Sequence, residues 1–172
     1  MDSSRSPPSS ATPTSAALGD FNGDTWADLA LLDPGSTRVR IGINKAALVP
    51  AEFGFREDAA PVTVGFGAKL VDAGRFDADG RDDLVVVRTL GVAQGEAAVL
   101  LAQGEGFVTA GSAGFPLNAT CLVVFSIDRA GTLDCAIGGA AATGGGAPFS
   151  LFTTANSITK SGQAQVTCRQ GA

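Results

Sequence analysis

The chain has 172 residues, enough for one domain with a substantial core. Apolar residues make up 45 % of it, which argues against disorder throughout, and its 23 glycines and eight prolines favour short strands and tight turns over long helices. The net charge of −5 argues against nucleic acid or an anionic membrane surface as a partner, and no apolar run is long enough to span a bilayer.

Residues 1–15 form a first segment with a composition of its own. This stretch is rich in serine, proline and threonine and lacks a hydrophobic signal core. Such a composition predicts a flexible linker or tail rather than folded structure. It leaves the compartment open, since a cytosolic protein and a mature secreted segment would both look like this.

An acidic loop follows. The stretch GDFNGDTWADLALL (residues 19–32) crowds side-chain oxygens into nine positions and then becomes apolar. Crowded carboxylates repel one another unless a cation neutralises them. Oxygens at positions one, three, five and nine of such a loop, with a backbone carbonyl at position seven, can wrap one hard cation. The chain has no histidine, so Ca²⁺ suits this set better than a transition metal. The predicted calcium ligands are Asp20, Asn22, Asp24, the backbone carbonyl of Trp26, and Asp28.

Two positions distinguish this loop from an EF-hand. An EF-hand needs glycine at position six and glutamate at position twelve, where this chain has Thr25 and Leu31. The simpler alternative to a metal site is that the Asp, Asn and Gly residues only form turns between strands.

The acidic pattern recurs twice. GRFDADGRDDLVVV (residues 74–87) is the second copy, and FSIDRAGTLDCAIGG (residues 125–139) is the third. The copies begin at positions 20, 75 and 126, so they are 55 and 51 residues apart. A period of this size is what a four-stranded propeller blade needs.

The later copies match the ligand pattern less completely. In the second, Arg75 stands at the first ligand position, where its guanidinium would neutralise the carboxylates in place of a metal, so both readings remain open. The other candidate ligands of this copy are Asp77, Asp79, the backbone carbonyl of Arg81, and Asp83. In the third copy Ala130 replaces a ligand, and this site is expected to be metal-free. Its remaining positions are Ser126, Asp128, the backbone carbonyl of Thr132, and Asp134.

Runs of four to nine β-branched or aromatic residues, bounded by Gly, Pro, Asn or Asp, fill the sequence between the acidic loops. No segment combines helical periodicity with helix caps. The sequence therefore predicts an all-β protein of propeller-type repeats, about three four-stranded blades, in blocks near residues 16–66, 67–118 and 119–172.

The nine-position pattern, followed by leucine and an apolar strand, resembles the FG-GAP and VCBS repeats of integrin-α-like β-propellers. The segment VGFGAKL (residues 64–70) is similar to the phenylalanine–glycine segment that gives the first repeat its name. The resemblance covers about residues 16–168. It implies that structural calcium rigidifies a loop between two strands of a blade, and that the module binds ligands outside the cell or at its surface.

A binding role is favoured over an enzyme, because the chain lacks histidine and tyrosine and carries no nucleophile or phosphate-binding motif. The expected function is a non-catalytic, calcium-stabilised binding or adhesion module for a protein or carbohydrate ligand, with no nucleic acid partner and no membrane insertion. The alternatives are a lectin with sugar pockets between blades, and a structural subunit or accessory domain of a larger complex. Three blades cannot close a ring, so further blades, a second copy or another subunit are expected to complete it.

Three cysteines and the single tryptophan complete the candidate residues. Cys121 and Cys135 align with apolar positions of the other repeats and are expected to be core thiols, while a disulfide from either to Cys168 remains an alternative. Trp26 is expected to pack between blades, and an exposed sugar-stacking platform is its alternative role.

Overall fold

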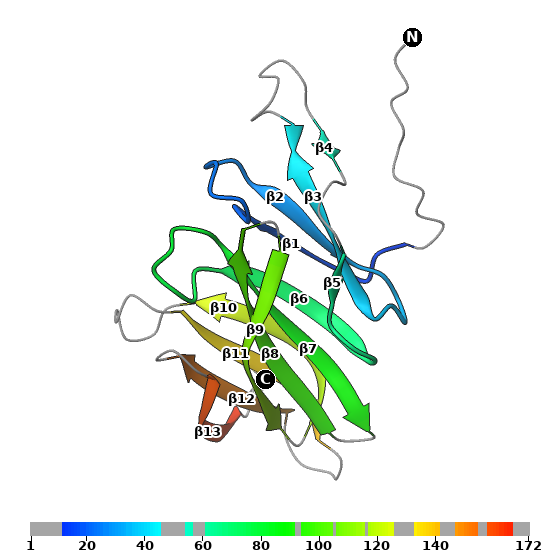
Figure 1. Cartoon of the computed structure of the whole chain (residues 1–172). Helices are drawn as coiled ribbons and strands as arrows, with labels where there is room; N and C mark the ends of the chain where they lie inside the picture. Colours follow the sequence, from blue (N-terminus) through cyan, green and yellow to red (C-terminus); the bar gives the residue numbers. More distant parts are fainter. Residues whose placement is uncertain are drawn as a thin grey trace, which may run out of the picture.

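The structure, a computed structural model, describes residues 12–45, 54–56, 61–91, 94–104, 106–115, 117–125, 133–141, 147–154 and 158–166. Thirteen strands within these ranges form three antiparallel sheets, and no α-helix occurs there (Figure 1). The predicted all-β class is confirmed.

Each sheet is a meander in which consecutive strands pair with one another. The first sheet has the order β1-β2-β3-β4, with β5 paired to β3, the second has β6-β7-β8-β9, and the third has β10-β11-β12-β13. The strand bounds are β1 (Ser15–Gly19), β2 (Asp28–Leu32), β3 (Arg38–Asn44), β4 (Phe55–Arg56), β5 (Val62–Thr63), β6 (Ala68–Gly74), β7 (Asp83–Gly91), β8 (Gln94–Gln103), β9 (Gly106–Phe115), β10 (Leu117–Phe125), β11 (Asp134–Ala141), β12 (Ala147–Thr154) and β13 (Ile158–Val166).

The burial of each strand follows from its place in the stack of sheets. Strand β2, DLALL, alternates between buried and half-buried residues, because successive side chains of a strand point to opposite faces. Strand β7 instead carries an unbroken buried run from Leu84 to Val87. An unbroken run of this kind indicates that the second sheet is covered on both faces.

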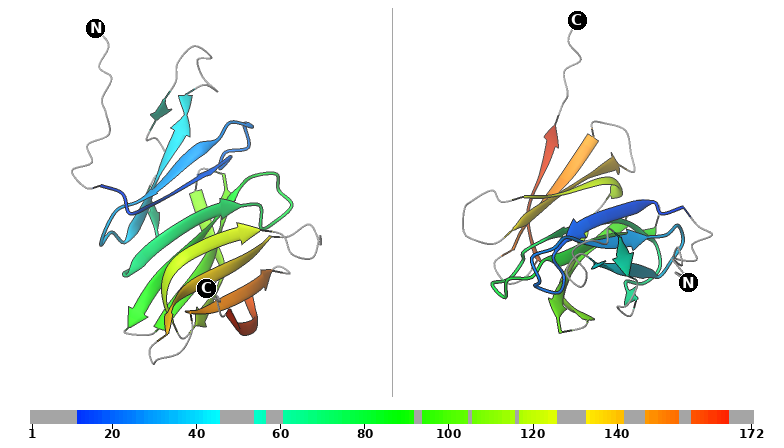
Figure 2. Two further views of the ribbon diagram at one scale, coloured as in Figure 1. Left: turned by 180° about the vertical axis from the view of Figure 1, so that it is seen from behind. Right: turned by 90° about the horizontal axis from the view of Figure 1, so that it is seen from above.

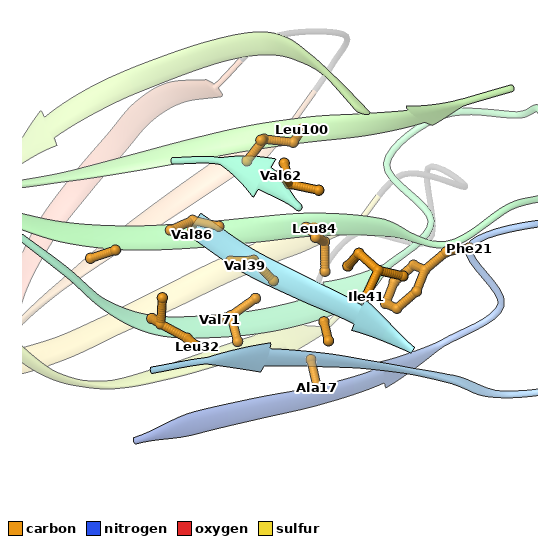
Figure 3. Packing of buried hydrophobic residues seen from close by; sticks show 12 residues of the cluster. Ala17, Phe21, Leu32, Val39, Ile41, Val62, Val71, Leu84, Val86 and Leu100 are labelled. Carbon is orange, nitrogen blue, oxygen red and sulfur yellow. The ribbon is translucent and has the colours of Figure 1, made fainter. Parts of the chain in front are cut away.

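The second sheet, green in Figures 1 and 2, lies between the other two. One apolar cluster joins the first sheet to the second, with Val39 and Ile41 of β3 facing Leu84 of β7 (Figure 3). A second cluster packs Val85 of β7 against Ile137 of β11. Each fully buried side chain of this size contributes about 1.5–3 kcal/mol, so the stack is held mainly by these two clusters.

The first strands of the three sheets, β1, β6 and β10, are neighbours and are linked by polar contacts. The Ser15 hydroxyl accepts a hydrogen bond from the backbone N–H of Val71 at 3.0 Å and donates to the carbonyl of the same residue at 3.3 Å. Asp72 accepts one from the backbone N–H of Val124 at 3.0 Å. Because hydrogen bonds are directional, these contacts fix how neighbouring sheets are aligned.

Two glycines allow the sheets to approach closely. A Cβ atom added to Gly19 would lie 2.9 Å from the Cβ of Asp82, and one added to Gly74 would overlap the side chain of Leu133. Both contact partners belong to the next repeat, so a larger residue at either position would push neighbouring sheets apart. The third repeat carries Phe125 at the corresponding position.

Residues 1–11 of the predicted N-terminal tail lie outside the described residues. The backbone N–H of Thr14 donates to the carbonyl of Leu32 at 2.9 Å, and β1 begins at Ser15. The first sheet therefore starts slightly before residue 16, where the sequence placed the first repeat. In the described part of the chain, no helix is long and apolar enough to cross a membrane.

Candidate metal centre

The first acidic loop joins β1 to β2, and Asp28 is the first residue of β2. Phe21 anchors the start of the loop, because its ring is buried and meets Phe107 edge-on with 5.7 Å between ring centres. Gly23 and Thr25 have positive φ angles of 81° and 72°, which turn the chain back on itself. All the predicted ligands of the first site therefore lie in one short, tightly turned segment.

Asp20 is a buried acceptor for backbone N–H groups. Its Oδ1 accepts from Gly23 at 2.7 Å and from Asp24 at 3.0 Å, and its Oδ2 accepts from Thr25 at 2.8 Å. Asp20 thus shapes the loop around its own side chain.

Asn22 and Asp24 are hydrogen-bonded to each other. The Asn22 amide nitrogen donates to Oδ2 of Asp24 at 2.8 Å, and the Asn22 Oδ1 accepts from the Asp24 backbone N–H at 2.9 Å. The Asp24 Oδ1 accepts from the backbone N–H of Trp26 at 2.8 Å. Both side chains therefore act as turn-forming residues in the structure as it stands.

Asp28 connects the loop to the third strand of its own sheet. Its side chain is fully buried, its Oδ2 accepts from the backbone N–H of Phe21 at 3.1 Å, and its Oδ1 accepts from that of Asn44 at 2.8 Å. Burial raises the pKa of this carboxyl group, and the nearby charges of Asp24 and Asp20 raise it further, against the effect of the two hydrogen bonds. Repulsion among the three carboxylates is thus a property of the folded loop.

In the second loop, Asp83 has the same role as Asp28 has in the first. Asp83, the first residue of β7, is fully buried, and its two oxygens accept from the backbone N–H groups of Phe76 at 2.7 Å and Ala102 at 2.8 Å. Burial raises the pKa of Asp83, and the charges of Asp77 and Asp79 add to this effect. The loop at residues 75–82 is therefore tied to β8 as the first loop is tied to β3.

Other side chains of the second loop face the solvent or the first repeat. Asp77 accepts from the backbone N–H of Asp79 at 3.0 Å, and Asp79 accepts from that of Arg81 at 2.8 Å. Arg75 forms an ion pair with Asp82 at 3.3 Å. The guanidinium is thus paired with a residue outside the predicted ligand set.

Asp82 makes a contact between loops that the sequence did not predict. Its Oδ2 accepts from the backbone N–H of Asp20 at 2.8 Å, and its own N–H donates to the Asp20 carbonyl at 2.8 Å. The first and second loops are therefore hydrogen-bonded to each other across the boundary between two sheets. The adjacent pair Asp82–Asp83 in the second copy was the available signal, since only one of the two residues is needed for the repeat pattern.

The third loop lies mostly outside the described residues. This is true of Ser126, Asp128, Ala130 and Thr132. Asp134 is described, and it is buried at the first residue of β11, as Asp28 and Asp83 are in β2 and β7. The last aspartate of all three copies therefore occupies the same place in its sheet.

The donor set of the first loop suits a hard cation. Carboxylate, amide and carbonyl oxygens are the ligands that Ca²⁺ takes, and an ionised carboxylate oxygen that accepts one N–H keeps a further lone pair. Within the described residues, no three His, Cys, Asp or Glu side chains are grouped so that they could hold a metal ion. Asp20, Asn22, Asp24, Asp28 and the carbonyl of Trp26 would supply the oxygens for such an ion. The residues fit Ca²⁺ by their chemistry.

Two expectations about apolar packing are wrong. Trp26 is 48 % exposed, because it lies in the loop and not in a strand that reaches the space between sheets. Cys121 is an exposed free thiol. It corresponds to Leu70, which packs toward the third sheet, whereas no described strand covers the matching face of the third sheet. Cys135 is buried as expected, and Cys168 lies outside the described residues.

The two described cysteines are expected to differ sharply in reactivity. Burial raises the pKa of Cys135 to about 12, and the charges of Asp134 and Asp72 add to this effect. Because the thiolate is the reactive form, iodoacetamide at pH 8 should modify Cys121 at least tenfold faster than Cys135. Peptide mass spectrometry over time measures both rates. In urea the two rates should converge, and equal rates without urea would contradict the buried position of Cys135.

Comparison with known proteins gives no assignment. No protein-family model matches this chain, and no curated protein matches it significantly. The likeness to FG-GAP and VCBS repeats thus rests on the motifs of the chain itself.

Proposed function

We propose that this protein is a non-catalytic binding module whose three sheets are propeller blades of the FG-GAP and VCBS type, with Ca²⁺ held in the first acidic loop. The observation that carries the proposal is the repeated aspartate anchor. Asp28 and Asp83 each accept one hydrogen bond from their own loop and one from the third strand of their own sheet. Loops held in this way at equivalent places in successive sheets can together form a binding surface.

The anchored loops suit recognition because they are fixed before any ligand arrives. The first two are also bonded to each other through Asp20 and Asp82. A rigid surface loses little conformational entropy on binding, which favours affinity. We propose a protein or carbohydrate ligand for this surface.

Calcium has a structural role in this proposal. Asp20, Asn22, Asp24, Asp28 and the Trp26 carbonyl would hold the ion, which would remove the repulsion among the three carboxylates. Sites of modest affinity are filled where free calcium is high, so the proposed location is outside the cell or at its surface. The ion supplies no reaction chemistry here.

The outer faces of the stack support completion by another unit. Leu18 of β1 is 64 % exposed and Val123 of β10 is 55 % exposed. Exposed apolar side chains at both ends of a stack are what further blades, a second copy or another subunit would cover.

Calcium binding is tested with the variant Asp24→Asn. Asparagine keeps an oxygen that can accept the Trp26 N–H but removes the charge, so the turn survives while the ion loses a ligand. Calorimetric titration should show calcium binding to the wild type and at least tenfold weaker binding to the variant. The melting temperature of the wild type should fall when a chelator is added.

Asp79→Asn is the matched control for the same charge change in the second loop. It should leave the first binding event unchanged. If calcium produces no heat and the chelator leaves the melting temperature unchanged, the first loop is only a turn and the calcium part of the proposal is wrong.

A further inference from the structure

A cavity of about 230 Å³ lies between the second sheet and the segment that follows β5. Its floor is the face of the sheet that carries Val86 and Leu100. Val64 and Gly65 form part of its wall, and their backbone N–H groups donate to the carbonyl of Thr37 at 2.8 and 3.2 Å. Residues from two neighbouring repeats therefore line this space, and none of the predicted calcium ligands is among them.

A β-bulge places two hydroxyl groups on the cavity face. Strand β9 pairs Ser112 with Ala98 and Thr109 with Leu100, and the register shifts between these pairs. Residues three apart on a regular strand point to opposite faces, but the extra residue, Ala110, returns both side chains to the same face. Ser112 and Thr109 both line the cavity as a result.

An ion pair lies on the same face. Arg88 of β7 and Glu96 of β8 are directly opposite in the ladder, with Arg88 Nε donating to Glu96 Oε2 at 2.7 Å and Arg88 Nη2 contacting the same oxygen. Burial raises the pKa of Glu96, but hydrogen bonds from Ser112 and Arg88 and the charge of Arg88 outweigh it, so the net shift is downward and the group is ionised at neutral pH. The lining therefore carries one charge of each sign.

Gly65 leaves room for the third nitrogen of the guanidinium. Its φ angle is 81°, and a Cβ atom added there would lie 2.5 Å from Nη1 of Arg88. Within the part of the chain that the structure describes, Nη1 forms no hydrogen bond. An unused donor thus stands beside a glycine at the cavity wall, close to the carboxylate acceptor of Glu96.

These features select a small neutral molecule rich in hydroxyl groups. An ionic ligand of either sign would meet a like charge, whereas a diol can accept from Arg88 and donate to Glu96 together. The hydroxyls of Thr63 and Thr109 can do both, and that of Ser112, which donates to Glu96, can accept. The volume lies below the roughly 300–1,000 Å³ of pockets for drug-sized ligands, which fits a single ring.

We propose that this cavity binds one sugar unit, free or at the end of a glycan. The inference rests on the proposed role as a binding module and names the class of its ligand. Phe66 adds support, because this aromatic residue directly follows Gly65 of the cavity wall and is 82 % exposed.

The test uses the full chain and neutral monosaccharides as probes: glucose, galactose, mannose, fucose, N-acetylglucosamine and N-acetylgalactosamine. Saturation-transfer NMR should show saturable binding of at least one of them, with a dissociation constant on the order of 1 mM. The double variant Thr109→Val with Ser112→Ala should bind it about tenfold or more weakly, because two hydrogen bonds are lost. Thr120→Val on β10, an exposed threonine outside the cavity, is the matched control and should bind as the wild type does.

Three results would overturn the proposal: no saturable binding of any of these sugars, equal binding by the double variant, or tighter binding of glucuronate or glucosamine than of the neutral parent sugar. Repeating the measurement with a chelator separates this site from the calcium site. If sugar binds but calcium titration gives no heat, only the proposed calcium site is wrong. If calcium binds but no sugar does, only the proposed sugar site is wrong.

Discussion

Replacing Asp83 with alanine is expected to lower the free energy of unfolding by about 3 kcal/mol or more. The substitution removes the carboxylate that accepts hydrogen bonds from the backbone N–H groups of Phe76 and Ala102. Each buried N–H left without an acceptor costs about 1–3 kcal/mol. Burial of the charged carboxylate is unfavourable, as the raised pKa of Asp83 indicates, and the variant no longer has this cost. The loss of stability is therefore smaller than the sum for the two unsatisfied N–H groups. Urea unfolding followed by circular dichroism measures the change.

A graded series separates the anchor from a general effect of lost charge. Asp83→Asn keeps one acceptor oxygen and should lose about half as much stability as Asp83→Ala. Asp79→Asn, at an exposed position of the same loop, should change the unfolding free energy by less than about 0.5 kcal/mol. Equal effects of Asp83→Ala and Asp79→Asn would contradict the anchor.

Replacing Gly67 with alanine is expected to cost about 2–4 kcal/mol of stability. Gly67 has a φ angle of 77°, and an added Cβ would overlap the carbonyl oxygen of Thr89. The two backbones are already joined by a hydrogen bond from the Thr89 N–H to the Gly67 carbonyl at 2.8 Å, so they cannot separate without breaking it. The variant therefore carries both backbone strain and a damaged contact. Thermal and urea unfolding measure the loss.

Gly35→Ala is the control for strain alone. Gly35 has a similar φ angle of 68°, but no atom lies within 4 Å of an added Cβ. Its replacement should lower the free energy of unfolding by about 1 kcal/mol, because alanine is strained in the left-handed conformation. The difference between the two variants measures the contact between Gly67 and Thr89, and equal losses would show that this contact carries no stability.

Local pattern was enough to predict the all-β class. The apolar runs after Asp28 and Asp83 form β2 and β7 because short runs of β-branched and aliphatic residues, bounded by turn residues, favour strands. The acidic loops likewise lie between the first and second strands of their sheets. These features depend only on neighbours in sequence.

What could not be predicted depends on neighbours in space. In the sequence Asp24 and Asp28 look alike, but the structure buries only Asp28 and gives it a backbone donor from β3. Cys121 aligns with Leu70 and yet is exposed, because alignment does not say whether another sheet covers a face. The pairing of Arg88 with Glu96 depends on the register of β7 and β8, which no local motif specifies.

The same spatial dependence governs how the chain could be enlarged by duplication of a repeat. Because Gly19 and Gly74 have no side chain, the next repeat can pack closely against them. The corresponding residue of the third repeat is Phe125. A new unit inserted before the third repeat would find a glycine ready to receive it. A unit added after the third in the same manner would meet the ring. A unit that packs against the third repeat would therefore make a different contact at this position, with the ring of Phe125 in place of a glycine.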